Sequence, residues 1–208
     1  MIQITVRTLV AAGLHPTQAR HFEAHLRAAC ERFGITTPAR IGGFIAQCRV
    51  ESAGFTRLEE DLRYRSPERL RQIFPTRIHS LSDAAALVAA GPQAIANRVY
   101  AGRLGNTEAD DGWRFRGRGI KQLTGRANYS DAAVELDRPY IDHPDLVAAP
   151  EDACLTAAWY WNTIKGNRLA DSAQWDAITL AVNGHAMLQA DLRRQYSEEA
   201  AAALLAMA

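Results

Sequence analysis

Apolar residues recur along most of the chain at the three- and four-residue spacing of amphipathic helices. One such series runs from Phe22 to Phe33 and is followed by Gly34, which tolerates the positive φ angle common just after a helix. Runs that alternate apolar and polar residues between turn signals, the pattern of half-buried strands, are scarce. The pattern predicts a mainly α fold with at most one small β-hairpin.

Short motifs mark where several helices begin. Thr37 followed by Pro38 is typical of an N-cap and a first helical position, and the apolar residues after them form one stripe running toward Gly54. Similar signals open three further helical segments, at Ser66-Pro67-Glu68, Gly91-Pro92 and Pro150-Glu151. Helical patterning continues in the C-terminal part, over residues 159–161, residues 175–182 and an Ala-rich stretch from about residue 187 to the end.

The character of the chain changes between residues 102 and 125, where six of the 14 glycines lie. Such a stretch does not predict a helix, because glycine lets the main chain approach a ligand closely and adopt conformations that other residues avoid. Its aromatic residues Trp113 and Phe115 argue against disorder. The stretch is therefore predicted to be a long loop or the backbone lining of a site.

Length and composition are those of one globular domain. The chain has 208 residues, of which 48% are hydrophobic and 23% charged, and this excludes collagen-like, coiled-coil and largely disordered proteins. Its 24 basic and 23 acidic residues give a formal net charge of +1, which argues against a dedicated nucleic-acid-binding protein. Without a repeat or linker, residues 1–208 are predicted to form a single domain, and we expect a monomer.

The cysteines and histidines do not predict a metal site, and the N-terminus does not predict export. Cys30, Cys48 and Cys154 are odd in number and widely spaced, which favours reduced, buried thiols. His21 and His25 have the spacing of two helical metal ligands but lack a third. There is no secretory leader and no run of the roughly 18 to 20 apolar residues that span a bilayer, so we expect a cytoplasmic protein without stable membrane insertion.

Two glutamates are candidates for acid–base chemistry. Glu51 lies at the end of the apolar-striped helix, where the helix C-terminus and apolar neighbours both favour the protonated carboxyl that a general acid needs. Glu60 follows nine residues later among charged neighbours, and the ionised form expected there suits a general base. From spacing alone, two ordinary surface glutamates are the more common explanation of such a pair.

Several motifs accompany the two glutamates along the chain. They are Arg49-Val50-Glu51-Ser52-Ala53-Gly54-Phe55, Glu60-Asp61-Leu62-Arg63-Tyr64, Ala96-Asn97-Arg98-Val99-Tyr100, Arg103-Leu104-Gly105-Asn106, the run over residues 111–129 that contains Arg116-Gly117-Arg118-Gly119 and Gln122-Leu123-Thr124, and residues 178–184. Over about residues 20–200 these motifs resemble glycoside hydrolase family 19, specifically its compact bacteriophage and prophage endolysin branch. The resemblance implies a lysozyme-like or chitinase-like helical fold with a central cleft.

The resemblance also implies roles for individual residues. Glu51 would protonate the glycosidic oxygen, Glu60 would activate water as the base, and Thr124 would hold that water. Family 19 enzymes invert the anomeric centre, which requires roughly 6.5 to 9.5 Å between the carboxyls, whereas about 5 Å indicates retention. No metal or organic cofactor is implied. The sugar subsites would be lined by Gln122, Asn128, Tyr129 and Asn183.

Three positions depart from the family pattern. Val50 replaces the usual His before the catalytic Glu and so changes the hydrogen bonding expected around Glu51. Ala53 replaces the usual Gly, and Arg63 replaces the usual Asn. An arginine at position 63 is placed to pair with Glu60 and hold it ionised.

Basic residues are concentrated near the proposed chemistry. Five of them and no acidic residue lie between Trp113 and Arg126, and four more arginines lie within residues 63–71. Such a cleft would attract an anionic polymer, so peptidoglycan, whose stem peptides carry carboxylates, fits better than neutral chitin. We expect Arg116 and Arg118 to contact this substrate. The competing explanation, expected for about half of these arginines, is that they pair with neighbouring acidic residues and only scaffold the loop.

The leading hypothesis is a peptidoglycan-degrading endolysin, an inverting hydrolase of the β-1,4 bonds between N-acetylmuramic acid and N-acetylglucosamine. It would bind glycan strands through the catalytic domain itself, since no separate cell-wall-binding module is visible. It would wait in the cytoplasm of an infected or prophage-bearing bacterium for a holin-type pore. The alternatives are a chitinase, a lytic transglycosylase that needs one carboxylate and leaves 1,6-anhydro ends, and a non-catalytic cell-wall-binding protein.

Overall fold

The computed structural model describes residues 2–207 and places them in two compact units. Unit 1 contains residues 2–58, 119–121 and 147–207, and unit 2 contains residues 59–118 and 122–146. The chain therefore passes from one unit to the other four times. The arrangement of residues 1–208 as one domain stays a prediction.

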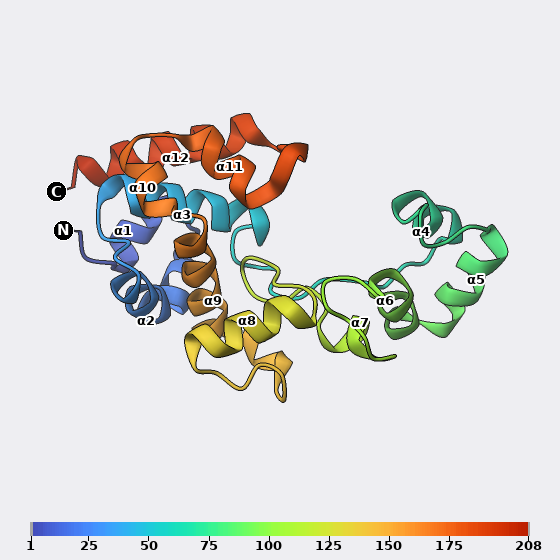
Figure 1. The fold of residues 1–208 in the computed structure, drawn as a ribbon. Coiled ribbons are helices and arrows are strands. Elements are labelled where there is room, and N and C mark those ends of the chain that lie inside the picture. The colour runs from blue at the N-terminus through green and yellow to red at the C-terminus, as the bar shows by residue number, and fades with distance from the viewer. Residues whose placement is uncertain (1, 208) are drawn as a thin grey trace. The chain divides into compact units, whose positions relative to one another are not determined.

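Unit 1 is built from helices at both ends of the chain. The C-terminal helix α12 (Ala190–Leu205) lies along α3 (Pro38–Glu51), and α9 (Pro150–Thr163) packs against α2 (Pro16–Arg32) (Figure 1). Their apolar side chains form one core that includes Phe22, Phe44 and Trp161. The remaining helices of unit 1 are α1 (Val6–Ala11), α10 (Gly166–Asp171), α11 (Trp175–Asn183) and the 3-10 turn η2 (Gly184–Ala186).

Helix α3 is buried on all sides over residues 41–48, although the pattern predicts only one apolar stripe. The expected N-cap is confirmed, because the Thr37 hydroxyl accepts the backbone N–H of Arg40 at 3.3 Å. Two glycines account for the wider burial. A Cβ at Gly42 would lie 2.7 Å from the backbone nitrogen of Ala201, so the backbone of α12 packs directly on α3. A Cβ at Gly43 would lie 2.9 Å from the Trp175 ring.

Unit 2 has its own small core. Leu62, Leu70, Ile95 and Val99 are buried there together, between helices that follow one another along the chain. The helices of unit 2 are α4 (Pro67–Ile73), α5 (Leu81–Ala90), α6 (Pro92–Tyr100), α7 (Asp111–Arg114) and α8 (Arg126–Leu136), and η1 (Pro144–Ala148) leads back into unit 1.

The glycine-rich stretch is a loop, as predicted, apart from the single helical turn α7. Gly112 allows that turn to form, since a Cβ there would lie 2.4 Å from the carbonyl oxygen of Ala96. Beyond α7, Arg118 forms isolated antiparallel bridges with Glu59 and with Leu123. Residues 2–207 contain no strand beyond these isolated bridges. The β-structure therefore does not exceed the one small hairpin that the pattern allows.

The expected mainly α fold is confirmed, and so are the predicted starts of α4, α6 and α9. The last helix begins at Ala190 rather than near residue 187. The reason is that Met187 and Gln189 have φ angles of 45° and 58°, which a helix cannot contain. The three cysteines are free and buried, as expected. Within the described part of the chain, no helix is both long enough and apolar enough to cross a bilayer.

Candidate active site

Glu51 is the last residue of α3, and a tight turn follows it. The hydroxyl of Ser52 donates to the Cys48 carbonyl at 2.6 Å and accepts the N–H of Phe55 at 2.8 Å. Ala53 and Phe55 have φ angles of 50° and 68°, in the left-handed region. Glycine is the usual residue at position 53 of the family pattern, and Ala53 therefore adds strain of about 1 kcal/mol.

The carboxylate of Glu51 is held by two cations. Arg193 of α12 donates to one oxygen at 2.6 Å, and Lys121 donates to the other at 3.3 Å. The Glu51 side chain is 14% exposed and that of Arg193 is 3% exposed. Both cations stabilise the ionised carboxylate, whereas the helix end and apolar neighbours emphasised by the sequence favour the protonated one.

Arg193 ties Glu51 into a buried polar network within unit 1. Its guanidinium also donates to the side-chain oxygen of Gln47 at 2.6 Å and to the Leu188 carbonyl at 3.0 Å. The Gln47 amide in turn donates to the hydroxyl of Thr179 at 3.4 Å. The position of the Glu51 carboxylate is therefore fixed from three helices, α3, α11 and α12.

A small pocket of about 20 Å³ lies beside Glu51, also within unit 1. This is room for about one water molecule. Gln47, Lys121 and Tyr160 are its polar lining, and the rest is mainly apolar. Burial raises the pKa of Tyr160, and the charge of Glu51 adds to this effect. The Tyr160 hydroxyl therefore stays protonated and donates to the Ala181 carbonyl at 2.9 Å.

Glu60, in unit 2, is held by neutral donors. The hydroxyl of Tyr100 lies 2.7 and 2.8 Å from its two oxygens, and the N–H of Gly117 donates to it at 3.3 Å. Burial raises the pKa of Tyr100, and the nearby Glu60 charge raises it further, so the phenol remains a donor. The expected partner Arg63 pairs instead with Asp61, at 2.9 Å, because the Arg63 backbone N–H also bonds Asp61 in a tight local turn.

Gly117 is surrounded by three of the predicted site residues. A Cβ at this position would lie 3.1 Å from the side-chain oxygen of Gln122, and 3.3 Å from both Glu60 Cβ and the Thr124 hydroxyl. The Thr124 hydroxyl donates its proton to the Gln122 carbonyl at 2.9 Å, and its oxygen can still accept a hydrogen bond. The predicted base and the predicted water-holding group therefore converge within unit 2.

The side-chain amide of each predicted asparagine makes one hydrogen bond to a backbone group. Asn128 donates to the Thr124 carbonyl at 2.7 Å, and so stabilises the residue that would position water. Asn183 is the last residue of α11, in unit 1. Its side-chain oxygen accepts the backbone N–H of Leu188, in the segment that follows the helix, at 2.6 Å. Both side chains are half-buried, and their contacts with sugars stay predictions.

Tyr129 and Arg118 have almost no surface with which to contact a substrate. Tyr129 is 0% exposed, and its hydroxyl donates to the Arg116 carbonyl at 2.9 Å. Arg118 is 4% exposed and pairs with Glu59 at 2.9 Å, and Arg116 pairs with the same carboxylate at 3.1 Å. Arg116 also stacks on the Trp113 ring at 3.9 Å. As placed, Tyr129 and Arg118 hold neighbouring groups of the loop, and their contacts with a sugar stay predictions.

The other basic residues of the loop are also occupied. Arg126 forms a two-pronged ion pair with the buried Asp111, at 2.5 and 2.8 Å. Arg114 donates to the Ile141 carbonyl at 3.1 Å, and Lys121 pairs with Glu51. Four of the five basic residues between positions 113 and 126 are therefore in ion pairs. Of the eight arginines in this loop and in residues 63–71, four pair with acidic neighbours, which is about the half expected. The loop is much less cationic than its sequence indicates.

A groove of about 330 Å³ lies beside Glu60 within unit 2. Its volume is in the range of small-ligand sites, roughly 300 to 1,000 Å³. The lining combines an aromatic ring and a proline with carboxylates and guanidiniums, a mixture that suits sugars with polar or charged substituents. Its residues are Glu59, Glu60, Asp61, Leu62, Arg63, Pro92, Trp113 and Arg116.

Comparison with known proteins places the chain in a family. No family model matches it. A protein of Haemophilus influenzae described as a glycosyl hydrolase family 19 domain-containing protein is 35% identical over 164 residues, which make up 76% of this chain and 78% of that protein. The chain belongs to glycoside hydrolase family 19. It is therefore a glycosidase.

Shorter matches and a solved structure agree with this family 19 assignment. The acidic 27 kDa endochitinase of Solanum lycopersicum is 42% identical over 55 residues, 26% of this chain and 22% of the plant protein. Chitinase 8 of Oryza sativa subsp. japonica is 42% identical over 57 residues, 26% and 21% of the two chains. The crystal structure of chitinase C from Streptomyces griseus superposes with a TM-score of 0.59 over 95% of this chain and 76% of that one. At 16% identity, this superposition shows a common fold.

Three side chains of this family 19 protein bind the candidate glutamates directly, and a fourth, Gln47, supports Glu51 through Arg193; the sequence did not predict these roles. Tyr100 is the last residue of one of the family motifs, and Lys121 is a charged residue within the glycine loop. Both could therefore have been identified from the sequence. Gln47 and Arg193 lie outside any recognised motif, and only their burial and hydrogen bonds reveal them. Among residues 2–207, no cluster of three or more His, Cys, Asp or Glu residues is arranged to hold a metal ion.

Proposed function

We propose that this family 19 glycosidase is a peptidoglycan-degrading endolysin that cuts the β-1,4 bonds between N-acetylmuramic acid and N-acetylglucosamine with inversion. The observation that supports the catalytic part is that each predicted glutamate is held in place by its own partners. Glu51 is bound by Arg193 and Lys121, and Glu60 by Tyr100 and the Gly117 N–H. Side chains held in this way are pre-positioned for proton transfer.

In the proposed mechanism one carboxyl acts as the acid and the other as the base. Glu51 gives its proton to the glycosidic oxygen while the bond from that oxygen to the anomeric carbon breaks. Glu60 takes a proton from a water molecule, whose oxygen bonds to the anomeric carbon from the other face. The Thr124 hydroxyl accepts a hydrogen bond from this water. Tyr100 holds the Glu60 carboxylate in place, because its hydroxyl donates to both carboxylate oxygens.

Two observations support peptidoglycan as the substrate. The glycine loop resembles the endolysin branch of the family, and the groove beside Glu60 contains Arg63, which is 78% exposed. An exposed guanidinium can exchange its bond with Asp61 for one with the carboxylate of a stem peptide or a lactyl group. Most cations of the loop are already in ion pairs within the protein. The exposed Arg63 is therefore a better argument for an anionic substrate than the loop arginines are.

Chitin is the second candidate substrate, because relatives with short matches are described as endochitinases. The aromatic and carboxylate lining of the groove also suits neutral N-acetylglucosamine chains. Membership in a family of hydrolases favours hydrolysis over a lytic transglycosylase or a non-catalytic wall-binding protein. As an endolysin, the protein would be stored in the cytoplasm and reach the wall through a holin-type pore.

The catalytic assignment is tested with Glu51→Gln and Glu60→Gln on two kinds of substrate. On peptidoglycan or chitin oligomers both variants should lose at least about 10³-fold in kcat. On an aryl glycoside with a highly activated leaving group, Glu51→Gln should recover most of its activity, because such a leaving group needs no proton. Glu60→Gln should stay inactive there. Full activity of Glu51→Gln on the polymers would sink the assignment.

The substrate is tested by mass spectrometry of the products from purified peptidoglycan and from chitin oligomers. Reducing N-acetylmuramic acid ends from peptidoglycan, with slow release from chitin, are the expected result. Faster cleavage of chitin would make the protein a chitinase. 1,6-Anhydro ends, together with an active Glu60→Gln variant, would indicate a transglycosylase. Tight sedimentation with cell walls and no turnover at any pH would indicate a binding protein.

A further inference from the structure

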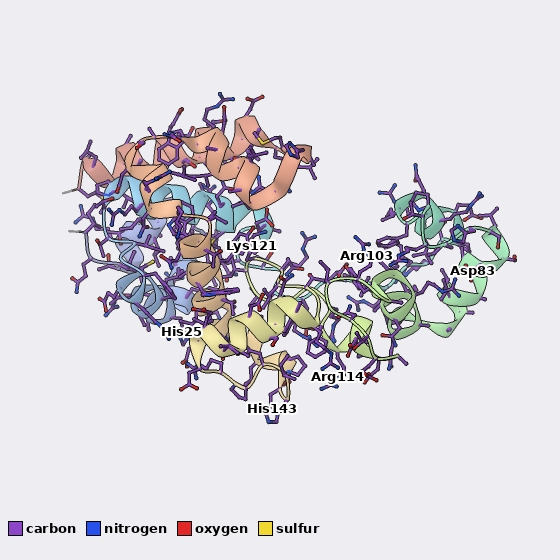
Figure 2. All side chains as sticks on the ribbon, viewed as in Figure 1. His25, Asp83, Arg103, Arg114, Lys121 and His143 are labelled. Carbon is purple, nitrogen blue, oxygen red and sulfur yellow. The ribbon has the colours of Figure 1, made fainter. Side chains whose placement is uncertain are left out.

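Lys121 is one of only two lysines in the chain, and its ammonium group lies against the Glu51 carboxylate. Its Nζ is 3.3 Å from the Glu51 Oε2 atom, 3.2 Å from the Val182 carbonyl oxygen and 4.8 Å from the centroid of the Tyr160 ring. Figure 2 labels this side chain. The three contacts come from α3, α11 and α9, so the ammonium is confined from several directions at once.

The backbone that carries Lys121 is also held firmly within unit 1. The neighbouring Ile120 is 0% exposed and belongs to the core of the unit. The N–H of Gly119 donates to the Leu58 carbonyl at 2.8 Å, and the φ angle of Gly119 is +75°, which favours glycine. A lysine on a rigid segment loses little further conformational entropy when it binds a carboxylate. More of the ion-pair energy therefore remains to stabilise that carboxylate.

Four ionisable side chains face Glu51 from the elements around it. Arg193 on α12 and Lys121 are cationic, whereas Tyr160 on α9 and Cys48 on α3 are neutral. Burial raises the pKa of the Cys48 thiol and of the Tyr160 phenol, which keeps both protonated. The charge around the carboxylate is therefore set by two cations, of which Arg193 is 3% exposed and Lys121 is 20% exposed.

The two cations differ in what else they do. Arg193 also binds Gln47 and the Leu188 carbonyl, so it joins helices of unit 1 as well as holding Glu51. Lys121 forms its one ion pair with Glu51, and its other contacts are with the Val182 carbonyl and the Tyr160 ring. The charge of Lys121 is thus the more readily removed without loss of the fold.

We propose that Lys121 is a positioning residue that stabilises the carboxylate formed when Glu51 gives up its proton, and so sets the alkaline limit of activity. The inference rests on the proposed role of Glu51 as proton donor. When Glu51 gives its proton to the glycosidic oxygen, the carboxylate that forms is stabilised by the ammonium. The same attraction opposes the protonated carboxyl before the reaction, so the enzyme gains acid strength and loses activity at a lower pH.

The test is the pH profile of kcat/KM for Lys121→Met, measured on whichever polymer the wild-type protein cleaves. Without the cation, the ion pair that stabilises the carboxylate is lost, so the alkaline limb should move upward by about one pH unit. The rate on the plateau should fall about three- to tenfold, because the acid is weaker. Lys121→Arg should restore both the limb and the rate, since it returns the charge.

A matched control is available in the other lysine. Lys165 is exposed and lies outside the candidate site, and Lys165→Met removes the same charge from the same unit. Its profile should coincide with that of the wild-type protein. Lys121→Gln provides a second neutral variant that can still bond to the Val182 carbonyl, and it should shift the limb as the methionine does if Lys121→Met fails to fold.

The outcomes separate this inference from the proposed function. An unmoved alkaline limb in Lys121→Met or Lys121→Gln, in a folded protein, overturns the inference, and so does a loss of rate that Lys121→Arg does not restore. Full activity of Glu51→Gln on the polymers instead overturns the proposed function. An inactive Glu51→Gln together with unshifted Lys121 variants leaves Glu51 as the acid and removes Lys121 from its control.

Discussion

The surroundings of Glu51 and Glu60 differ in chemistry and in origin. Glu51 ends a core helix of unit 1 and is bound by two cations, whose residues lie 70 and 142 positions away in the sequence. Glu60 lies on an irregular segment of unit 2 and is bound by a phenol and a backbone N–H, 40 and 57 positions away. Neutral donors stabilise a carboxylate without adding charge, whereas cations also change how strongly it holds a proton.

This difference matters because the two proposed roles make opposite demands. A base must be ionised before the reaction. The neutral donors Tyr100 and the Gly117 N–H bind the Glu60 carboxylate without adding a charge. An acid must be protonated before the reaction and ionised after it. The cations at Glu51 stabilise the second of these states.

The largest expected effect comes from removing the buried cation at Glu51. Arg193→Met leaves Gln47 and the Leu188 carbonyl without their shared donor and should lower the free energy of unfolding by about 3 kcal/mol. Chemical denaturation measures this. The neighbouring Arg194 is 41% exposed and pairs with Asp176 at the surface, so Arg194→Met should cost less than about 1 kcal/mol. Equal losses in the two variants would contradict the assigned role of Arg193.

The second effect tests the corresponding ion pair of unit 2. Burial by itself raises the pKa of Asp111, but hydrogen bonds from Arg126 and from the Glu108 and Thr107 N–H groups outweigh it and lower the pKa. Asp111→Asn should therefore cost about 2 to 3 kcal/mol at neutral pH.

The pH dependence of this cost follows from the sign of the shift. A carboxyl with a lowered pKa in the folded protein stabilises it above the unfolded pKa of about 3.9, and the contribution disappears as the pH falls through the folded value. The difference in unfolding free energy between the wild-type protein and Asp111→Asn should thus shrink at acidic pH. A difference that grows on acidification would contradict the ion pair.

The third effect concerns the neutral donor at Glu60. Tyr100→Phe removes a charge-assisted hydrogen bond to both carboxylate oxygens and should lower kcat/KM about 10- to 30-fold. Tyr64→Phe is the matched control: burial and the charge of Glu60 raise the pKa of Tyr64, but this half-buried ring packs on Phe74. A similar loss in both variants would argue for a packing role.

The smallest effect tests the turn after Glu51. Ala53 has a φ angle of 50°, and Ala53→Gly should raise the free energy of unfolding by about 0.5 to 1 kcal/mol. Because the turn fixes the end of α3, activity should change little. A destabilised Ala53→Gly variant would mean that the greater freedom of glycine in the unfolded chain outweighs the relief of strain.

Local features were predicted well from the sequence. Thr37, Ser66 and Pro150 mark helix starts that the structure has, because N-caps and first-turn prolines act within a few residues. The departure at Ala53 likewise coincides with a left-handed residue. The glycine stretch was correctly predicted as a loop except for the turn at α7, whose Gly112 packs on the preceding helix, α6.

By itself, the sequence determined the helical fold class, the two candidate glutamates and the glycine loop, since these depend on periodicity and on motifs short enough to recognise. Only the tertiary structure decided that Arg193 and Lys121 bind Glu51, that Tyr100 binds Glu60, and that Tyr129 is buried. A charged side chain looks the same in a sequence whether it faces solvent or a carboxylate. Its partner is chosen by packing between segments far apart in the chain, and burial then determines how strongly that partner acts.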